Sequence, residues 1–468
     1  MTVKSFRYNH YLVVPALTAA LLAGCASSPA PRFDAERVVP DSWHGVKETT
    51  ALSEPLEGGW WASFNSPELN ELMARAMADS FTLQASLERI EQARSRLTSS
   101  RAALFPQLDA GYSFSRSDQW QGGNRTGSSE SDRLNIGASY EVDLWGRVRA
   151  GVRSSLAALE SSEYAHLGAR LSLQAELAGA YLQWLAAQDR LRYARDSLTA
   201  SEEVLRLIEL QFREGSASQL ELVQQQAAVA SQRTQINDLE NARQQIAYAL
   251  AALIGQPPGT LELRGDSLAA ITLPAVEPEQ PADLLRRRPD LLQAEQQLVA
   301  ANANVDAARA ALFPSLRLSA SANAGALLTG GASATASALG ASLAQPLFQG
   351  GRLRADIAAA QSSEREVLAS YYQTALQAIL EVENVLADLD TQGRNSELEA
   401  HSLALAERAY ELADLRYRSG AADYLTLLDA QRSLISRQDS YVQFELSRYQ
   451  SALNLYRALG GSWWSAEN

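Results

Sequence analysis

The chain has 468 residues, of which 46% are hydrophobic and 20% charged, and its formal net charge is −13 at pH 7. This charge argues against nucleic acid as a partner, because nucleic-acid binding needs a basic surface. Lysine occurs only as Lys4 and Lys47, and neither has the glycine spacing of a Walker-type phosphate loop. Four scattered histidines and one cysteine form no local metal site. We therefore expect neither an enzyme nor a metalloprotein.

Residues 1–24 have the pattern of a signal peptide. Lys4 and Arg7 precede an apolar run over 12–22, which is shorter than the roughly 20 residues that span a bilayer. The run ends in Leu22-Ala23-Gly24-Cys25, which resembles a bacterial lipobox. Because the sole cysteine falls where cleavage would occur, we expect a covalent lipid on Cys25 and no other cofactor. The alternative is an ordinary signal peptide with an incidental cysteine. Residues 25–64 form a lipidated lead-in rich in Pro, Ser and Gly.

One hexapeptide occurs twice, since 101–106 and 309–314 both read Arg-Ala-Ala-Leu-Phe-Pro. In each copy a helical pattern runs into Phe-Pro and then becomes strict alternation, because proline ends the helix and favours an extended residue before it. The offset holds roughly elsewhere and predicts two tandem repeats, 65–255 and 289–460.

The segment between the repeats, 256–288, is rich in proline and is expected to be a linker or an equatorial layer. Its last residues, Arg286–Arg288, are expected to form a solvated surface rather than a binding site. Residues 461–468 form a C-terminal tail.

After each Phe-Pro the apolar period becomes two, which predicts strand hairpins near 107–143 and 315–346. In the first hairpin we expect a polar, glycine-rich loop over 117–132. Each strand has about ten residues, the length of a tilted transmembrane β-strand, although a soluble two-sided sheet would fit any one hairpin equally well. Four strands cannot close a barrel, and open edges are not tolerated in lipid. If the strands span a membrane, several copies must therefore share the barrel.

The remaining chain is predicted to be helical. A helix from Ser66 to Leu104 is expected to break near Asp79-Ser80, and another runs from Pro289 to Leu312. The segments 147–213 and 352–418 each correspond to ~100 Å of helix at 1.5 Å per residue. Each is followed by a glycine turn, at Gly215 or Gly420, and a shorter return helix.

Apolar residues on the long helices and their return helices follow heptad spacing, with polar residues on the alternate stripe. A solid antiparallel coiled coil would explain the heptads alone. A hollow barrel also explains the wet stripe. The predicted fold is thus mainly α with membrane β: a long α-helical coiled-coil barrel continuous with a shared transmembrane β-barrel of four strands per chain, in two tandem repeats.

Several motifs carry a resemblance to a known family. They are Asp143-Leu144-Trp145-Gly146-Arg147, Arg288-Pro289-Asp290 with Ala294-Glu295, Pro346–Gly351, and Arg416–Gly420 followed by Tyr424–Gln431. With the lipobox, they resemble the outer membrane factors of tripartite efflux systems, particularly the lipoprotein branch, over essentially the whole mature chain. The resemblance implies a homotrimer in the Gram-negative outer membrane with a large periplasmic extension. Its implied partners are a periplasmic adaptor (membrane fusion) protein, an inner-membrane pump of the RND type and outer membrane lipid.

The resemblance also implies where a gate would lie. The turns at Gly215 and Gly420 would form the periplasmic tip, where the tunnel narrows and the adaptor docks. Leu425 and Asp429 would each form a threefold ring, the first a hydrophobic constriction and the second a cluster of carboxylates that attracts cations. From the residues alone, an i, i+4 surface pair on one helix explains these two positions equally well.

Two more residues of the motif, Tyr417 and Arg418, would help to hold the inner helix pair. The first-repeat turn, Gly215–Gln219, lacks an acid at the position that matches Asp429, so we expect one carboxylate ring.

We therefore expect a passive outer membrane exit duct that conducts small molecules and drugs. One rival is the same architecture in protein secretion. The other is a periplasmic coiled-coil spacer tethered by Cys25, which would have no need of amphipathic strands of spanning length.

Overall fold

The computed structural model describes residues 33–34, 37–44, 59–274, 280–325 and 334–461. The predicted signal peptide, the lipobox with Cys25, most of the lead-in and the tail beyond Gly461 lie outside the described residues. The chain divides into two compact units. Unit 1 comprises Met1–Phe33, Ile90–Ser162 and Ala294–Tyr371, and unit 2 comprises Asp34–Arg89, Glu163–Gln293 and Tyr372–Asn468. Both units take segments from both sequence repeats.

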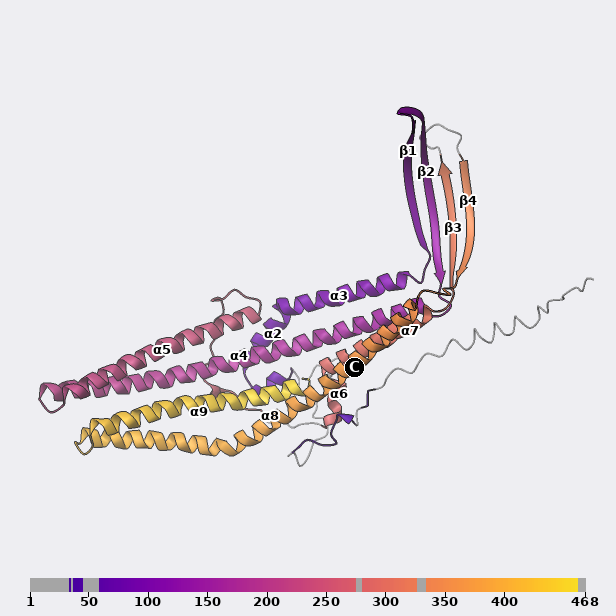
Figure 1. Ribbon diagram of the computed structural model, residues 1–468. Helices are drawn as coiled ribbons and strands as arrows, with labels where there is room; N and C mark the ends of the chain where they lie inside the picture. The colour runs from indigo at the N-terminus through magenta and orange to yellow at the C-terminus, as the bar shows by residue number, and fades with distance from the viewer. Residues whose placement is uncertain (1–32, 35–36, 45–58, 275–279, 326–333, 462–468) are drawn as a thin grey trace, which may run out of the picture. The chain divides into compact units, whose positions relative to one another are not determined.

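The helices and strands follow the same order in each repeat (Figure 1). The helices are α2 (Pro67–Asp79), α3 (Phe81–Ala102), α4 (Arg147–Arg213), α5 (Gln219–Leu253), α6 (Leu284–Arg287), α7 (Pro289–Ala310), α8 (Arg352–Arg418) and α9 (Tyr424–Ala458). The strands are β1 (Gln107–Gln121), β2 (Asn124–Val142), β3 (Ser315–Gly325) and β4 (Ala334–Ala344). Short 3-10 helices cover Trp60–Phe64, Leu268–Ala270 and Pro281–Asp283.

The long helices have the same lengths in the two repeats. Helices α4 and α8 each have 67 residues, and helices α5 and α9 each have 35. The predicted break in the first helix is confirmed, because α2 ends at Asp79 and α3 begins at Phe81. No helix in the described part of the chain combines the length and the apolar character needed to cross a membrane.

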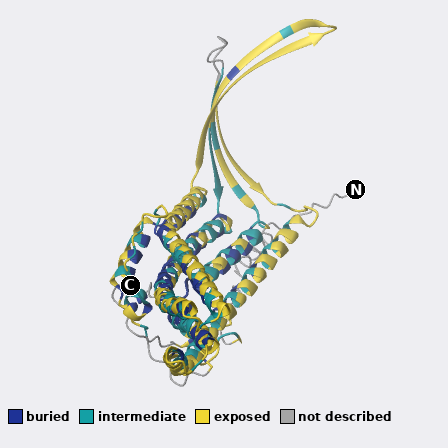
Figure 2. Cartoon of the chain, turned by 90° about the vertical axis from the view of Figure 1, so that its left-hand side faces the viewer, coloured by how far each residue is buried: buried dark blue, intermediate teal, exposed yellow. Residues whose placement is uncertain are grey.

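Unit 1 contains a four-stranded antiparallel sheet in the order β1-β2-β3-β4. The pairs Ala138↔Ala320 and Ala320↔Leu339 place alternate residues of the strands on one apolar face. The described part of the chain does not cover that face: the exposed fraction is 74% for Leu108 and 89% for Leu339. Figure 2 accordingly shows the strands mostly in the colour of exposed residues. A sheet with an uncovered apolar face needs a partner or a lipid environment.

The expected loop over 117–132 is wrong. Strands β1 and β2 continue through this segment and turn only at Gly122 and Gly123, whose φ angles are 62° and 86°. Two residues with positive φ allow the tight hairpin turn that matches strand twist. Polar cross-strand contacts, including Ser115 Oγ to Ser131 Oγ at 2.8 Å, replace apolar ones here. Side chains still alternate between the two faces of the strands here, but too few of them are hydrophobic for the sequence to reveal the pattern.

The two repeats also meet at the base of the sheet in unit 1. The Trp145 indole stacks on Phe313 with ring centroids 4.9 Å apart, and its Nε1–H donates to the carbonyl oxygen of Pro314 at 2.7 Å. Trp145 belongs to the junction after β2, and Phe313-Pro314 is the second Phe-Pro switch. This contact holds the two strand-to-helix junctions together.

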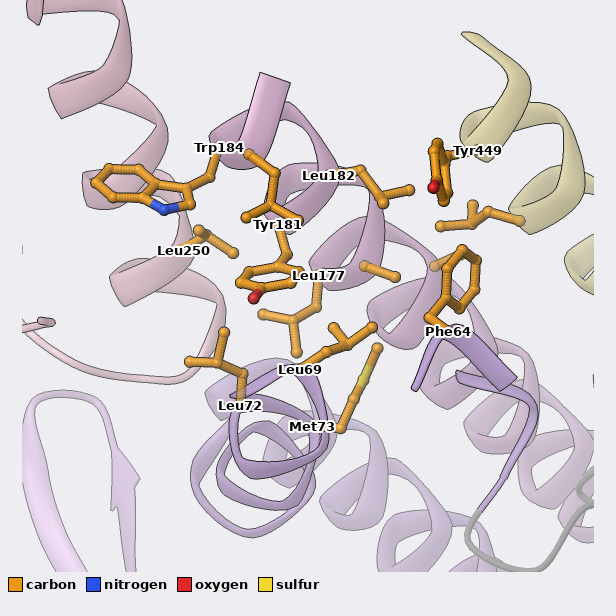
Figure 3. Close-up of a cluster of buried hydrophobic side chains, with 14 of the residues drawn as sticks. Phe64, Leu69, Leu72, Met73, Leu177, Tyr181, Leu182, Trp184, Leu250 and Tyr449 are labelled. Atoms are coloured by element: carbon orange, nitrogen blue, oxygen red, sulfur yellow. The ribbon is translucent and has the colours of Figure 1, made fainter. Parts of the chain in front are cut away.

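The main core of unit 2 gathers residues from both repeats (Figure 3). Leu69 and Met73 of α2 pack against Leu177 and Leu182 of α4, and all four side chains are fully buried. The Tyr449 hydroxyl of α9 donates to the carbonyl oxygens of Leu268 and Ile271 at 3.2 and 3.0 Å. The segment between the repeats is thereby fastened to the helices. Burial of so many large side chains stabilises the packing of α2, α4 and α9 here.

Arg288 corrects the expectation of a solvated arginine run. Its guanidinium is buried and pairs with Asp290 at 2.8 Å and Glu381 of α8 at 2.9 Å. Its Nη1 also donates to the carbonyl oxygen of Ala458 at the end of α9. Two carboxylates and a helix C-terminus satisfy the charge, so its pKa lies above the usual value even though burial lowers it. Arg286 alone of the three is fully on the surface.

Candidate functional site: the turn ends of the helix hairpins

The two hairpin turns in unit 2 have the same backbone geometry. After α4, the Gly215 N–H bonds to the carbonyl of Phe212 at 3.0 Å and the Ser216 N–H to that of Gln211 at 2.8 Å. After α8, Gly420 and Ala421 make the equivalent bonds, at 3.0 and 2.7 Å. This is the Schellman motif, which needs a left-handed residue. The φ angles of 77° at Gly215 and 73° at Gly420 explain why glycine stands at both positions.

Each return helix starts with a side-chain cap. Ser218 and Glu221 form a reciprocal capping box on α5, with the Ser218 N–H donating to Glu221 Oε2 at 2.8 Å. On α9, Asp423 Oδ1 accepts from the Thr426 N–H at 2.9 Å, and the bonds from Thr426 lower the pKa of the Asp423 carboxyl. These caps satisfy backbone N–H groups at the starts of α5 and α9 and thereby fix where each return helix begins.

Leu425 and Asp429 lie on the exposed side of the first turns of α9. Leu425 is 56% exposed, Asp429 is exposed as well, and the spacing of four residues places them on one helix face. The opposite face carries Tyr424, Leu427 and Leu428, all buried in a cluster that α4, α8 and α9 form together. Among the described residues Asp429 has no ion pair. The geometry leaves an apolar and an acidic side chain free to face another molecule.

Tyr417 and Arg418 make different kinds of contact. The Tyr417 hydroxyl donates to Gln211 Oε1 of α4 at 3.0 Å and thus links the two hairpins. Arg418 instead pairs with Asp414 on its own helix, with Nε and Oδ2 2.7 Å apart. That bond, ahead of the opposing burial, raises the pKa of Arg418. Arg418 therefore stabilises α8 itself, whereas Tyr417 connects α8 with α4.

A second hydrogen bond between the hairpins was not predicted from the sequence. Tyr424 donates its hydroxyl to Gln225 Oε1 at 2.9 Å, and the Gln225 amide donates to the carbonyl and the Oγ of Ser201, at 2.8 and 2.9 Å. Gln225 and Ser201 are fully buried, and burial raises the pKa of Tyr424 to about 12. Gln225 and Ser201 occupy heptad positions at which apolar residues are usual. That departure is the only signal the sequence offers.

Leu220 is a further residue of the site that was not predicted from the sequence. The offset between Gly215 and Gly420 matches Leu220 to Leu425, and Leu220 is 66% exposed in the first turn of α5. Gln224 stands at the position that matches Asp429. Both hairpins therefore present an exposed leucine one turn after the glycine, and one of the two presents an acid behind it.

Farther from the turns, two polar contacts join α4 to α9. Arg190 Nε and Asp439 Oδ1 are 2.6 Å apart, and Ser197 Oγ lies 3.3 Å from Gln438 Oε1. These polar contacts add to the apolar cluster near the turns and to the main core in joining the two hairpins.

Comparison with known proteins agrees with this architecture. The family model for outer membrane efflux proteins matches residues 72–256 and 281–461, one match for each repeat. The pyoverdine export outer membrane protein OpmQ of Pseudomonas aeruginosa is 38% identical over 460 residues, with 95% of each chain covered. The toluene efflux pump outer membrane protein TtgC of Pseudomonas putida is 33% identical, with 96% of this chain and 95% of that protein covered.

Two solved structures extend the comparison to the fold. The outer-membrane channel OprN superposes with a TM-score of 0.81 at 30% identity and covers 92% of this chain and 99% of that chain. The outer membrane protein VceC of Vibrio cholerae gives 0.76 at 27% identity, with 87% and 99% covered. The predicted fold class and family resemblance are confirmed. From its two matched repeats and its full-length relatives, this chain belongs to the outer membrane efflux protein family and is an outer membrane efflux channel.

Proposed function

We propose that three copies of the chain form a passive exit duct. The observation that carries this proposal is the sheet of unit 1: one face is apolar and exposed, and β1 and β4 each have an edge without a pairing strand among the described residues. Unpaired edges are costly in lipid, so each edge strand must pair with another copy. The number three comes from the family resemblance, because strand pairing alone allows other closed numbers.

The duct works with a periplasmic adaptor protein and an inner-membrane pump of the RND type. Exposed apolar side chains at the hairpin ends support docking there: Leu210 is 49% exposed, Val223 52% and Leu415 64%. Such side chains near the tips need a partner, either another copy or the adaptor. The chain itself supplies no energy and catalyses no reaction.

A covalent lipid on Cys25 anchors each copy in the outer membrane, and no other cofactor takes part. One lipidated residue adds membrane affinity that the membrane strands reinforce. The substrates are small molecules. Two relatives are named for pyoverdine export and toluene efflux, which supports small organic compounds as the class.

Leu425 and Asp429 close the tip in this proposal. Their exposure on one face of α9, opposite the buried face with Tyr424, leaves them for the duct axis. Tyr417 holds α8 against α4, Arg418 stabilises α8 through its ion pair with Asp414, and Gly215 and Gly420 shape the turns. Three leucines would exclude water, and three carboxylates would favour cations.

The test is single-channel conductance in planar bilayers. We expect a small, cation-preferring conductance that rises in Leu425→Ala and Asp429→Ala, with the cation preference reduced in the second variant. Leu398→Ala and Glu397→Ala, at exposed positions in the middle of α8, serve as controls and should leave the conductance unchanged. Conductance that is equal in all variants would move the gate elsewhere. The absence of any pore from a folded oligomer would favour the tethered spacer.

A further inference from the structure

The apolar face of the sheet in unit 1 contains a hollow that the proposed duct does not use. It has a volume of about 560 Å³ and lies across β2, β3 and β4, near the end of the sheet at which Pro106 precedes the first residue of β1. Besides Pro106, three consecutive residues of each strand line it. They are Ala138, Ser139 and Tyr140 of β2, Leu318, Ser319 and Ala320 of β3, and Leu339, Gly340 and Ala341 of β4.

The hollow follows from the register of the strands. Ala138, Ala320 and Leu339 form one cross-strand row, and Tyr140, Leu318 and Ala341 form the next. All six side chains are on the apolar face, because each row is two residues from the other. Three of these six side chains are alanines that lie beside the larger Tyr140, Leu318 and Leu339, which leaves a shallow, open apolar depression. Its shape and chemistry suit a hydrocarbon chain.

The hollow lies at the level of one leaflet. It begins only a few residues above Val142 and Ser315, where β2 ends and β3 begins at the helix side of the sheet. In an outer membrane channel whose helices extend into the periplasm, this side of the sheet meets the inner leaflet. The acyl chains of a lipidated N-terminus enter that same leaflet.

The described N-terminal segment runs along α8 in the direction that would lead from a lipidated N-terminus near the sheet. Phe33 stacks on Tyr371 with centroids 4.3 Å apart, the Asp34 N–H donates to the Tyr372 hydroxyl at 3.0 Å, and the His44 N–H donates to Glu383 at 3.0 Å. Residue numbers rise together on the two segments. Toward its N-terminus, the segment therefore heads for Arg352, the first residue of α8, and for the base of the sheet.

The lengths also agree. Tyr371 is 19 residues from Arg352, which corresponds to about 29 Å of helix. Cys25 precedes Phe33 by eight residues, and an extended chain of that length spans about 26–29 Å. When the intervening chain is extended, the Cα of Cys25 can thus reach about the level of Arg352, the residue at which α8 begins after the sheet. An acyl chain on Cys25 then begins close to the hollow.

We infer that the hollow on β2–β4 is the seat of an acyl chain carried by Cys25 of the same chain. The inference rests on the proposed lipid anchor and adds its binding site. A covalent tether keeps this acyl chain beside the hollow, so the chain need not be recruited from the surrounding lipid. Seating the chain there would fix the lipidated N-terminus against the sheet and cover apolar surface that otherwise depends on mobile lipid.

Photo-cross-linking of the full-length lipoprotein in its outer membrane tests the inference. Cells incorporate a fatty acid with a diazirine near its middle, and the protein is irradiated, purified as the oligomer and digested. Mass spectrometry first establishes that the Cys25 peptide is acylated. We expect a cross-linked pair that joins this peptide to a peptide containing 138–140, 318–320 or 339–341.

Two variants sharpen the result. Ala320→Phe fills the hollow and should abolish this cross-link, whereas Ala324→Phe, on the same face of β3 but outside the lining, should preserve it. The wild-type cross-link map is informative even if a variant fails to assemble. Cross-links from the Cys25 peptide that avoid the lining would overturn the inference, as would cross-linking of the lining to phospholipid alone. An unacylated Cys25 would instead refute the anchor itself, while the channel activity of the oligomer would remain a separate question.

Discussion

Tyr424 of α9 donates a hydrogen bond to Gln225 of α5, and the two residues are 199 positions apart in the sequence. The bond joins the return helix of one repeat to that of the other, within a turn or two of the hairpin ends. Because Gln225 also donates twice to Ser201 of α4, three helices share one buried polar network. Breaking the network leaves buried polar atoms unsatisfied, which is costly.

Tyr424→Phe should loosen the two hairpins from each other. The change removes the donor to Gln225 Oε1 at a site that is 2% exposed, and an unsatisfied buried acceptor costs about 1–3 kcal/mol. We expect a lower unfolding midpoint and a higher single-channel conductance. Tyr248→Phe, an exposed tyrosine of α5 bonded to Gln244, is the matched control and should change neither quantity. If Tyr424→Phe lowers stability without changing conductance, the bond is structural and does not hold the tip.

Leu220→Ala should act like Leu425→Ala. Both leucines follow the glycine turn by the same number of residues and are exposed, so we expect both to line the constriction. Each single variant should raise the conductance, and the double variant should raise it more than either. The converse test is Gln224→Asp, which supplies the missing acid of the first repeat and should increase the cation preference. Reversal-potential measurements would show it. A cation preference equal to that of the unmodified protein would place Gln224 off the ion path.

Arg288→Met should be strongly destabilising. It leaves Asp290 and Glu381 without their cation and the carbonyl of Ala458 without a donor, and breaking a buried charge pair costs roughly 3–5 kcal/mol. Arg286→Met, two residues away and exposed, should change stability by less than about 0.5 kcal/mol. Denaturant unfolding of the detergent-solubilised protein compares them. Adding Glu381→Gln to Arg288→Met should restore part of the loss, and no restoration would mean that packing rather than charge is responsible.

His166 should make stability depend on pH in the weakly acidic range. Burial and then the positive charge of Arg170 lower its pKa from 6.5, and its Nδ1 lies 2.7 Å from Ser86 Oγ. The unfolded chain therefore binds a proton that the folded one resists, so stability is full above about pH 6.5 and falls as the pH drops from there toward the folded pKa. His166→Gln should flatten this decline, and His401→Gln, at an exposed position, should leave it intact. Thermal midpoints between pH 5 and pH 8 measure the difference.

Local patterns were sufficient for the secondary structure and the repeat. The Phe-Pro switches predicted where helix becomes strand, and glycine predicted both hairpin turns, because proline and left-handed glycine act on the backbone within a few residues. The same reasoning failed over 117–132, where the strands continue with polar side chains on both faces. Because these side chains are polar, the sequence does not show the two-residue period of the strands, although the backbone pairing continues.

Leu425 and Asp429 could be singled out from a motif, yet their exposure together on one face of α9 came from the packing of Tyr424, Leu427 and Leu428 on the other. Gln225 and Arg288 show the limit more clearly. Heptad spacing says that a residue faces a neighbour, but it does not say which neighbour or at which layer. Besides the nearby Asp290 and Ser201, the partners of these two side chains are Glu381, Ala458 and Tyr424, which lie about 90 to 200 residues away in the sequence.

The order of helices and strands, the duplication and the family were thus present in the one-dimensional pattern, since each depends on residues close together in the chain. The choice of polar partners between the repeats, the burial of Arg288 and the hollow on the sheet were decided by tertiary structure. They depend on the register between segments, and register is set by packing and backbone pairing over the whole unit rather than by any local preference.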